Sequence, residues 1–263
     1  VFKKNIHLVD TLLKLNFLVN KIFSPEHGFK GSADAGAYIE NDKYHNIPIV
    51  SLYGKKKKPN IEDLKEIEIM IFDIQDVGVR YYTYISTLHY IMEACAENDI
   101  PLIVLDRYNP NRRYIDGPIL KSEYKSFIGM HPVPIVYGMT IGEYALMING
   151  EKWLNDNLEC DLKVIKVGGY YNDFKSSIFI TSTENNIWIY AIDYTKFTWN
   201  YKGIYQPTFP IIFEKNLRIP PSPNLPNYLA INFYPSLCLF EGTSVSVGRG
   251  TDKPFQHFGS PHF

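Results

Sequence analysis

Three short segments of the sequence combine an apolar, strand-like run with acidic and basic residues that directly follow it. They are Phe23-Ser24-Pro25-Glu26-His27-Gly28-Phe29, Phe72-Asp73-Ile74-Gln75-Asp76-Val77-Gly78 and Val104-Leu105-Asp106-Arg107. In an open α/β sheet, the residues just beyond the carboxyl ends of the strands form the ligand-binding crevice. The pattern therefore predicts one cleft that collects carboxylates, a histidine and an arginine, a set of groups suited to acid/base chemistry.

Glu26 is the first candidate for that chemistry. It lies at a predicted strand end, and Gly28 allows the backbone to turn sharply after it. A glutamic acid held in a cleft that is partly shielded from water can act as a general acid near neutral pH. A surface-loop glutamate beside a capping histidine, His27, would have the same local sequence, so the residues alone leave both interpretations open.

The second segment offers a further carboxylate. Asp73, Gln75 and Asp76 follow its strand. The alternation of side chains places Asp73 and Gln75 on one side of the chain and Asp76 on the other. These residues could hydrogen-bond a ligand, and one of them could be a second catalytic carboxylate. They could equally cap the next helix, so the sequence does not decide between the two roles.

Tyrosines surround a single arginine in the next part of the chain. Arg80 could pair with an anionic group of a substrate, or it could balance Asp73 or Asp76. Tyr82 and Tyr84 each present a flat apolar face and a hydroxyl, which suits stacking against a sugar ring. An ordinary aromatic core would use the same residues.

The composition bounds the class of protein. The chain has 263 residues, 45% of them hydrophobic, which is enough to bury the core of one large domain or two ordinary ones. A net charge of −1 argues against nucleic acid as a partner. No apolar run approaches the roughly 20 residues of a transmembrane helix. The run from Lys55 to Lys58 is interpreted as a solvated loop before a helix.

The sequence gives no support for a metal or another cofactor. Its three cysteines form no CxxC pair, so they indicate neither a disulfide framework nor a zinc site. It contains no metalloprotease or EF-hand spacing and no glycine fingerprint of a dinucleotide-binding or P-loop protein. A G-x-S-x-G elbow is also missing, which disfavours a serine hydrolase.

Strand-like and helix-like patterns alternate along the first 150 residues. We expect helices over 6–15, 59–67, 83–98 and 141–149, and strands over 17–23, 49–52, 69–74, 101–105 and 161–167. Asn60, Thr83 and Thr140 are the expected N-caps, Thr140 forming a capping box with Glu143. A long polar loop is expected between residues 28 and 46. The alternation predicts an α/β fold with a Rossmann-like, mostly parallel sheet and helices on both faces.

The pattern changes near residue 153. Residues 178–194 are rich in Ile, Trp, Tyr and Thr and predict β structure. The proline-rich segment 220–227 predicts an extended, turn-rich stretch. We therefore expect a Rossmann-like catalytic domain over residues 1–153 and a smaller α+β auxiliary domain over residues 154–263.

These motifs resemble those of the NamZ-type exo-β-N-acetylmuramidases of peptidoglycan recycling. The resemblance covers nearly the whole chain, and beyond the three segments above it extends to Ser51-Leu-Tyr-Gly54, Tyr82-Thr-Tyr-Ile-Ser86, Met92-Glu-Ala-Cys-Ala96, Gly129-Met-His-Pro132, Pro221-Ser-Pro-Asn-Leu-Pro-Asn227 and Tyr234-Pro-Ser-Leu-Cys-Leu-Phe-Glu-Gly-Thr243. It implies a Rossmann-like N-terminal domain, a smaller C-terminal domain and an active site in the cleft. The implied activity removes terminal N-acetylmuramic acid from the non-reducing end of peptidoglycan fragments.

The resemblance also implies roles for single residues. Glu26 matches the glutamate thought to be catalytic, and the other matching positions are His27, Gln75, Asp76, Arg80, His131 and Glu241. We expect Glu26 to protonate the glycosidic oxygen. Asp76 or Glu241 would activate water or stabilise the oxocarbenium-like transition state, unless the 2-acetamido group of the substrate is the nucleophile. The other residues expected to bind muramyl sugars are Asp73, Tyr82, Tyr84 and an arginine for the lactyl carboxylate, which would be Arg80, Arg107 or Arg249.

A non-catalytic protein that binds cell-wall sugars is the alternative, since it needs the aromatic cleft but no working acid. Compared with the family, the chain lacks the first strand, ends where the family continues, and carries extra residues between Val167 and Pro220. We therefore expect both domains to be incomplete. The sequence shows no signal-peptide pattern, but the location of the polymer predicts a periplasmic or secreted protein.

Overall fold

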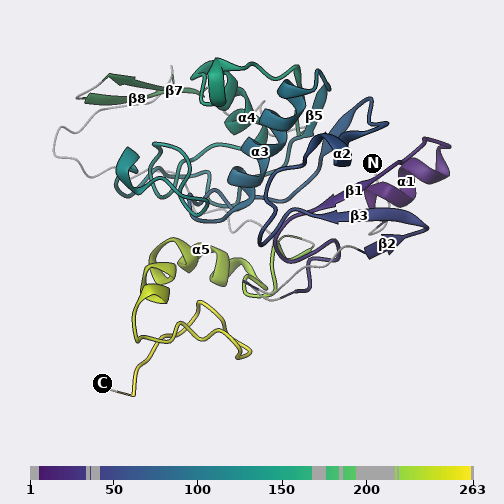
Figure 1. Ribbon diagram of the computed structural model, residues 1–263. Helices are drawn as coiled ribbons and strands as arrows, with labels where there is room; N and C mark the ends of the chain where they lie inside the picture. The colour runs from purple at the N-terminus through teal and green to yellow at the C-terminus, as the bar shows by residue number, and fades with distance from the viewer. Residues whose placement is uncertain are drawn as a thin grey trace.

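The computed structural model describes residues 6–33, 36, 42–167, 176–183, 186–193, 217 and 219–261 (Figure 1). Its strands are β1 (Ile22–Ser24), β2 (Asp42–Tyr44), β3 (Ile47–Ser51), β4 (Met70–Phe72), β5 (Leu102–Leu105), β6 (Leu162–Ile165), β7 (Ser176–Thr183) and β8 (Asn186–Asp193). Its helices are α1 (Leu8–Lys14), α2 (Ile61–Leu64), α3 (Tyr84–Glu97), α4 (Ile141–Gly150) and α5 (Tyr228–Leu237), with short 3₁₀ helices η1 (Ser122–Tyr124), η2 (Asn155–Asn157) and η3 (Cys238–Gly242).

The strands form two three-stranded sheets and a hairpin. One sheet has the order β1-β3-β2, with β1 parallel and β2 antiparallel to β3. The other has the order β4-β5-β6 and is entirely parallel. The hairpin of β7 and β8 agrees with the β structure expected for residues 178–194. The α/β class with a parallel sheet is thus confirmed, although β6 lies beyond residue 153, and the domain boundary stays a prediction.

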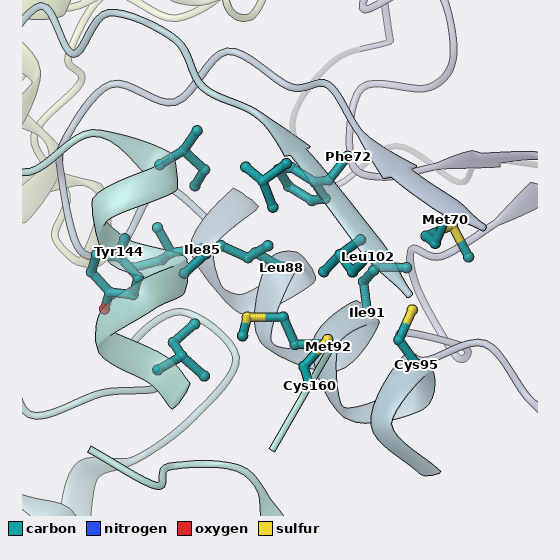
Figure 2. Packing of buried hydrophobic residues seen from close by; sticks show 14 of the residues in the cluster. Met70, Phe72, Ile85, Leu88, Ile91, Met92, Cys95, Leu102, Tyr144 and Cys160 are labelled. Atoms are coloured by element: carbon teal, nitrogen blue, oxygen red, sulfur yellow. The ribbon is translucent and has the colours of Figure 1, made fainter. Parts of the chain in front are cut away.

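Helices α3 and α4 cover one face of the β4-β5-β6 sheet. In Figure 2, Ile85 and Leu88 on α3 lie between Tyr144 on α4 and Leu102 on β5, and all four belong to the main hydrophobic cluster. On the opposite face, Ile71 of β4 remains 39% exposed. Within the described residues, α3 and α4 therefore pack on the same face of this sheet.

The start of α4 is held by a local capping box and by the side chain of Asp106, which is distant in the sequence. Thr140 and Glu143 form the predicted capping box. The two oxygens of the Asp106 carboxylate accept hydrogen bonds from Thr140 Oγ1 at 3.0 Å and from the Gly142 amide at 2.8 Å. A Cβ on Gly142 would lie 2.7 Å from Cγ of Asp106, so this close approach requires glycine. Asp106, at the end of β5, is thus used to anchor the next helix.

Two elements differ from the expectation. Strand β2 lies within the predicted polar loop 28–46. Its polar sequence is not typical of a strand, and it forms by pairing with β3 in a short antiparallel ladder. Helix α5 contains Pro235 and directly follows the proline-rich segment, so the sequence did not predict it. Its N-cap, Asn227, accepts a hydrogen bond from the amide of Ala230 at 3.0 Å.

Helix α5 attaches the C-terminal segment to the N-terminal part. Ile231 and Tyr234 on α5 pack in one buried cluster with Val77 and Tyr82. The hydroxyl of Tyr82 donates to the carbonyl of Pro221 at 2.8 Å. The C-terminal segment thereby covers the stretch that leads into α3, and Figure 1 shows α5 on the side of the molecule away from α4. None of the helices in the described part of the chain combines the length and apolar character needed to cross a bilayer.

Candidate active site

A pocket of about 590 Å³ lies where the loops after β1 and β3, the start of α3 and the C-terminal segment meet. Its wall contains two carboxylates, one arginine, one lysine and several aromatic rings. They are Glu26, Glu241, Arg249, Lys57, Tyr53, Tyr81, Tyr82, Tyr84, Phe127, Tyr234 and Phe255. The volume and this mixture of apolar rings with a few charged groups are typical of a small-molecule site.

Glu26 projects into this pocket from the end of β1, as the sequence predicted, and both of its carboxylate oxygens are hydrogen-bonded. Oε1 accepts the hydroxyl of Tyr53 at 2.9 Å and the amide of Gly36 at 3.2 Å. Oε2 accepts the hydroxyl of Thr83 at 2.7 Å. Three donors from three separate segments therefore hold one carboxylate in a defined orientation.

The turn after Glu26 is kept in place by His27. His27 and Gly28 both have positive φ, at 72° and 75°. Nδ1 of the buried His27 lies 2.8 Å from the carbonyl of Ala33, which ties the two ends of the loop together. The His27 ring also meets Tyr84 edge to face, with centroids 6.4 Å apart. His27 therefore lines the pocket and also shapes the loop that presents Glu26.

Thr83 has a different role from the one the sequence predicted. It occupies the N-cap position of α3, but its side chain makes no capping hydrogen bond. Its hydroxyl instead donates to Glu26. A side-chain N-cap typically stabilises a helix by about 1 kcal/mol. Helix α3 lacks this contribution from Thr83, because the hydroxyl binds the Glu26 carboxylate instead.

Tyr53 was not predicted as a site residue. It follows β3 as Glu26 follows β1, and these two strands are parallel neighbours, so their ends meet. Burial, and next the hydrogen bond to Glu26, raise the pKa of Tyr53 to about 12. The phenol therefore stays protonated at neutral pH and keeps its hydrogen atom available to Glu26. Tyr53 could have been identified from the sequence because it follows a predicted strand, as Glu26 does.

Glu241 and Arg249 come to the pocket from the C-terminal segment. Arg249 Nη1 donates to Glu241 Oε1 at 2.8 Å, and the thiol of Cys238 lies 3.1 Å from Glu241 Oε2. Burial raises the pKa of Cys238, so this residue remains a thiol at neutral pH. The structure thus brings Glu241 and Arg249 to the same pocket as Glu26, in agreement with their predicted place in one site.

Tyrosine rings line one side of the pocket in an edge-to-face series. Tyr82 meets Tyr84 with centroids 4.8 Å apart, and Tyr234 meets Phe255 at 5.0 Å. Burial raises the pKa of Tyr82 and of Tyr84. Both phenols therefore remain neutral, and their hydroxyls donate to the carbonyls of Pro221 and Glu26. What the two rings add to the pocket wall is apolar surface of the kind that suits a sugar ring.

Asp76 was predicted as a possible second catalytic carboxylate, but the structure does not place it on the pocket wall. It is buried, and its Oδ2 accepts hydrogen bonds from the hydroxyl of Tyr137 and, at 2.7 Å, from the amide of Gly78. Burial raises the pKa of Asp76 to about 6, against a lowering by the Tyr137 hydrogen bond. Its contacts organise the turn after β4 beneath the tyrosines.

Four further residues predicted to contact substrate are used elsewhere. Gln75 donates to the backbone carbonyls of Asp76 and Tyr108, both at 2.7 Å. Asp73 and Arg107 form an ion pair with each other, Nε to Oδ1 at 2.7 Å, outside the pocket. The guanidinium of Arg80 is buried against the carbonyls of Pro118 and Val133, and burial lowers its pKa. These contacts join the ends of β4 and β5, which are neighbours in one sheet, whereas the end of β1 lies in a different sheet.

His131 lies in the core, not in the pocket. Its Nδ1 is 3.0 Å from the hydroxyl of Tyr144, and its Nε2 is 2.9 Å from Nδ1 of His89. Its ring stacks on Trp153 with centroids 4.8 Å apart. Burial lowers the pKa of both histidines, to about 4 for His89. The pair is therefore a neutral, satisfied element of the core at neutral pH.

Among the described residues, no group of three or more His, Cys, Asp and Glu side chains has the arrangement of a metal site. The chemistry that the pocket offers on its own is that of a positioned carboxylate facing a second carboxylate and a cation. Such a set suits proton transfer to a leaving group together with stabilisation of developing positive charge.

Comparison with known proteins assigns the chain to a family. An α/β fold with a carboxylate at a parallel strand end and an aromatic pocket defines the class as an α/β protein with a small-molecule site. The family described as "Exo-beta-N-acetylmuramidase NamZ, N-terminal" matches residues 1–189, and its C-terminal counterpart matches residues 232–263. The chain belongs to this NamZ exo-β-N-acetylmuramidase family.

Individual relatives agree with this assignment. The peptidoglycan β-N-acetylmuramidase NamZ of Bacillus subtilis is 41% identical over 244 residues, which are 91% of this chain and 49% of that protein. A solved DUF1343 family protein from Bacteroides fragilis is 44% identical, with a TM-score of 0.74 over 99% of this chain and 59% of that one. A second from the same species is 35% identical, with a TM-score of 0.72 over 96% and 56%. The chain thus spans about half the length of the curated relative it matches.

The environment of Asp76 predicts a characteristic pH dependence of stability. Its native pKa, about 6, lies above the reference value of 3.8. The stabilising contribution of the protonated carboxyl is therefore fully present below pH 3.8 and is lost as the pH rises through 6. The free energy of unfolding of the wild type should therefore fall by about 2 kcal/mol relative to that of Asp76→Asn when the pH rises from 4 to 7. Urea unfolding of both proteins at the two pH values measures this change.

Tyr137→Phe serves as the second variant, because it removes a donor that lowers the pKa of Asp76. Tyr137→Phe should therefore raise the pKa of Asp76 further, so that the loss of stability continues to a higher pH than in the wild type. If the free energies of unfolding of the wild type and Asp76→Asn differ by the same amount at pH 4 and pH 7, Asp76 is not a buried carboxyl with a raised pKa.

Proposed function

We propose that this chain carries the site of a glycosidase that removes terminal N-acetylmuramic acid from the non-reducing end of peptidoglycan fragments. Membership in the NamZ family and the name of the Bacillus subtilis relative support this proposal. The observation that carries it is the position of Glu26, whose carboxylate lies in a sugar-sized pocket and is oriented by Tyr53, Thr83 and Gly36.

Glu26 is the proposed general acid. In the reaction it would donate its proton to the glycosidic oxygen as the bond to the anomeric carbon breaks. Hydroxyl groups can both donate and accept hydrogen bonds. The hydroxyls of Tyr53 and Thr83 can therefore hold Glu26 before and after it loses its proton, and they keep it aimed at the same atom throughout.

Glu241 is the proposed second group. Of the two carboxylates considered for this role, Glu241 lies on the pocket wall, whereas Asp76 is buried behind the tyrosines. Glu241 would activate water or stabilise the positive charge that develops on the sugar ring. A nucleophilic 2-acetamido group of the substrate would serve equally well, in which case Glu241 would orient that group.

Substrate binding would involve the aromatic series and Arg249. Among the three arginines proposed for the lactyl carboxylate, Arg249 lines the pocket, while Arg80 and Arg107 are used in other contacts. The lactyl carboxylate would share the guanidinium of Arg249 with Glu241. Because the polymer lies outside the cytoplasmic membrane, the proposed place of action is the periplasm or the cell exterior.

Replacement of Glu26 tests the general acid. Glu26→Gln keeps the shape and hydrogen-bonding capacity of the side chain but cannot donate the proton, so kcat on muramyl disaccharides should fall about 10²- to 10⁴-fold. Glu62→Gln is the matched control, because Glu62 forms an exposed ion pair with Lys65 and does not line the pocket. The measurement is release of N-acetylmuramic acid, with the Bacillus subtilis relative as the positive reference.

Calorimetry in parallel separates the enzyme from the sugar-binding alternative. If the wild type binds muramyl disaccharides but releases no N-acetylmuramic acid, the chain is a binding module and the proposed activity is refuted. Turnover by Glu26→Gln at the wild-type rate would refute the assignment of the acid.

Tyr53→Phe tests whether Tyr53 is a positioning residue. The variant keeps the ring but removes one donor from Glu26, so kcat should fall about tenfold or more while KM changes little. A purely structural role would lower thermal stability and leave kcat unchanged in the folded fraction. Tyr124→Phe, at an exposed tyrosine away from the pocket, is the control. Equal kcat values for Tyr53→Phe and the wild type would contradict the positioning role.

A further inference from the structure

A second, more open hollow of about 500 Å³ adjoins the pocket that contains Glu26. It is lined by Gly54, the four consecutive lysines Lys55 to Lys58, Asn60 and Tyr90. The two hollows share Gly54 and Lys57, so they are continuous. Among the described residues, no aspartate or glutamate lines the second hollow.

Carboxylates around the hollow balance only part of this charge. Lys58 pairs with Glu93 and Glu97, each at 2.6 Å. Lys56 pairs with Asp63. Within the described part of the chain, neither Lys55 nor Lys57 has a carboxylate partner, so the hollow presents two uncompensated ammonium groups.

Lys57 lies where the two hollows join. Its Nζ is 4.5 Å from the centroid of the Phe127 ring, which lines the Glu26 pocket. Phe127 in turn stacks on Tyr90 of the second hollow, with ring centroids 6.2 Å apart and planes at 11°. A continuous aromatic surface with a cation above it therefore connects the two hollows.

We propose that the second hollow is the subsite for the part of the glycan beyond the cleaved bond, and that Lys55 and Lys57 make it select a chain that carries carboxylates. This inference rests on the proposed glycosidase function. The aromatic pocket that contains Glu26 would hold the terminal sugar, and the more open second hollow would hold the departing chain. Stacking on Tyr90 would place that chain, and the ammonium groups would bind the lactyl or peptide carboxylates on its next muramyl unit.

The experiment compares three substrates. The first is a chromogenic N-acetylmuramide, which has no glycan beyond the cleaved bond. The second is a muramyl tetrasaccharide with free lactyl carboxylates, and the third is the same tetrasaccharide with its reducing-side lactyl carboxylate converted to an amide. The wild type and a Lys55→Gln/Lys57→Gln variant are assayed on all three substrates. Lys65→Gln, at an exposed lysine paired with Glu62, is the control for loss of a lysine outside the hollow.

The readout is the ratio of kcat/KM for each tetrasaccharide to kcat/KM for the chromogenic substrate. For the free tetrasaccharide this ratio should fall about tenfold in the double variant and stay unchanged in Lys65→Gln. For the amide it should be low already in the wild type and unaffected by the double variant. The same ratio for all proteins and both tetrasaccharides would overturn the inference.

Binding measurements keep this inference separate from the proposed activity. In a Glu26→Gln background, calorimetry should show that the free tetrasaccharide binds more tightly than its amide, and that the double variant and added salt remove this difference. If the wild type turns over no substrate but the difference in affinity is present, the glycosidase proposal fails and the carboxylate-binding subsite stands. If turnover is normal and the difference in affinity is absent, the subsite is refuted and the activity stands.

Discussion

The proposed active site depends on one interaction, the hydrogen bonding of the Glu26 carboxylate by three donors. Tyr53 brings its hydroxyl from the loop after β3, Thr83 from the start of α3, and Gly36 its amide from the loop after β1. Each donor alone contributes a modest net free energy, about 1 kcal/mol or somewhat more for a charged acceptor. Together they fix the direction of the side chain, because all three must be satisfied at once.

The C-terminal segment completes the pocket around this carboxylate. Tyr81 and Tyr82 donate hydrogen bonds to backbone carbonyls of Pro235 and Pro221, which ties α5 and the proline-rich segment to the stretch before α3. Beneath these tyrosines, Asp76 and Tyr137 fix the turn after β4. Glu241 and Arg249 thereby reach the wall of the pocket that contains Glu26, although both follow Glu26 by more than 200 residues in the sequence.

The sequence was sufficient for local features and insufficient for long-range ones. The helix caps at Asn60 and Thr140 were predictable because their hydrogen bonds close within three residues. Glu26 was predictable as a pocket residue, since a strand end followed by a turn exposes its side chain. Asp76 was predicted as a second catalytic carboxylate, and Arg80 and His131 as substrate-binding residues. Their partners are Tyr137, backbone carbonyls and His89, which no local pattern reveals. The departure of Thr83 from its capping role likewise depends on a partner 57 residues away.

A crystal structure of the Glu26→Gln variant with a muramyl disaccharide is the sharpest test of Glu26 as the general acid. We expect the N-acetylmuramyl ring in the pocket between the tyrosines and the Glu241–Arg249 pair. The glycosidic oxygen should lie within hydrogen-bonding distance, about 3 Å, of the side chain at position 26. A disaccharide bound elsewhere, or a residue 26 side chain directed away from the glycosidic oxygen while still held by Tyr53 and Thr83, would contradict this assignment.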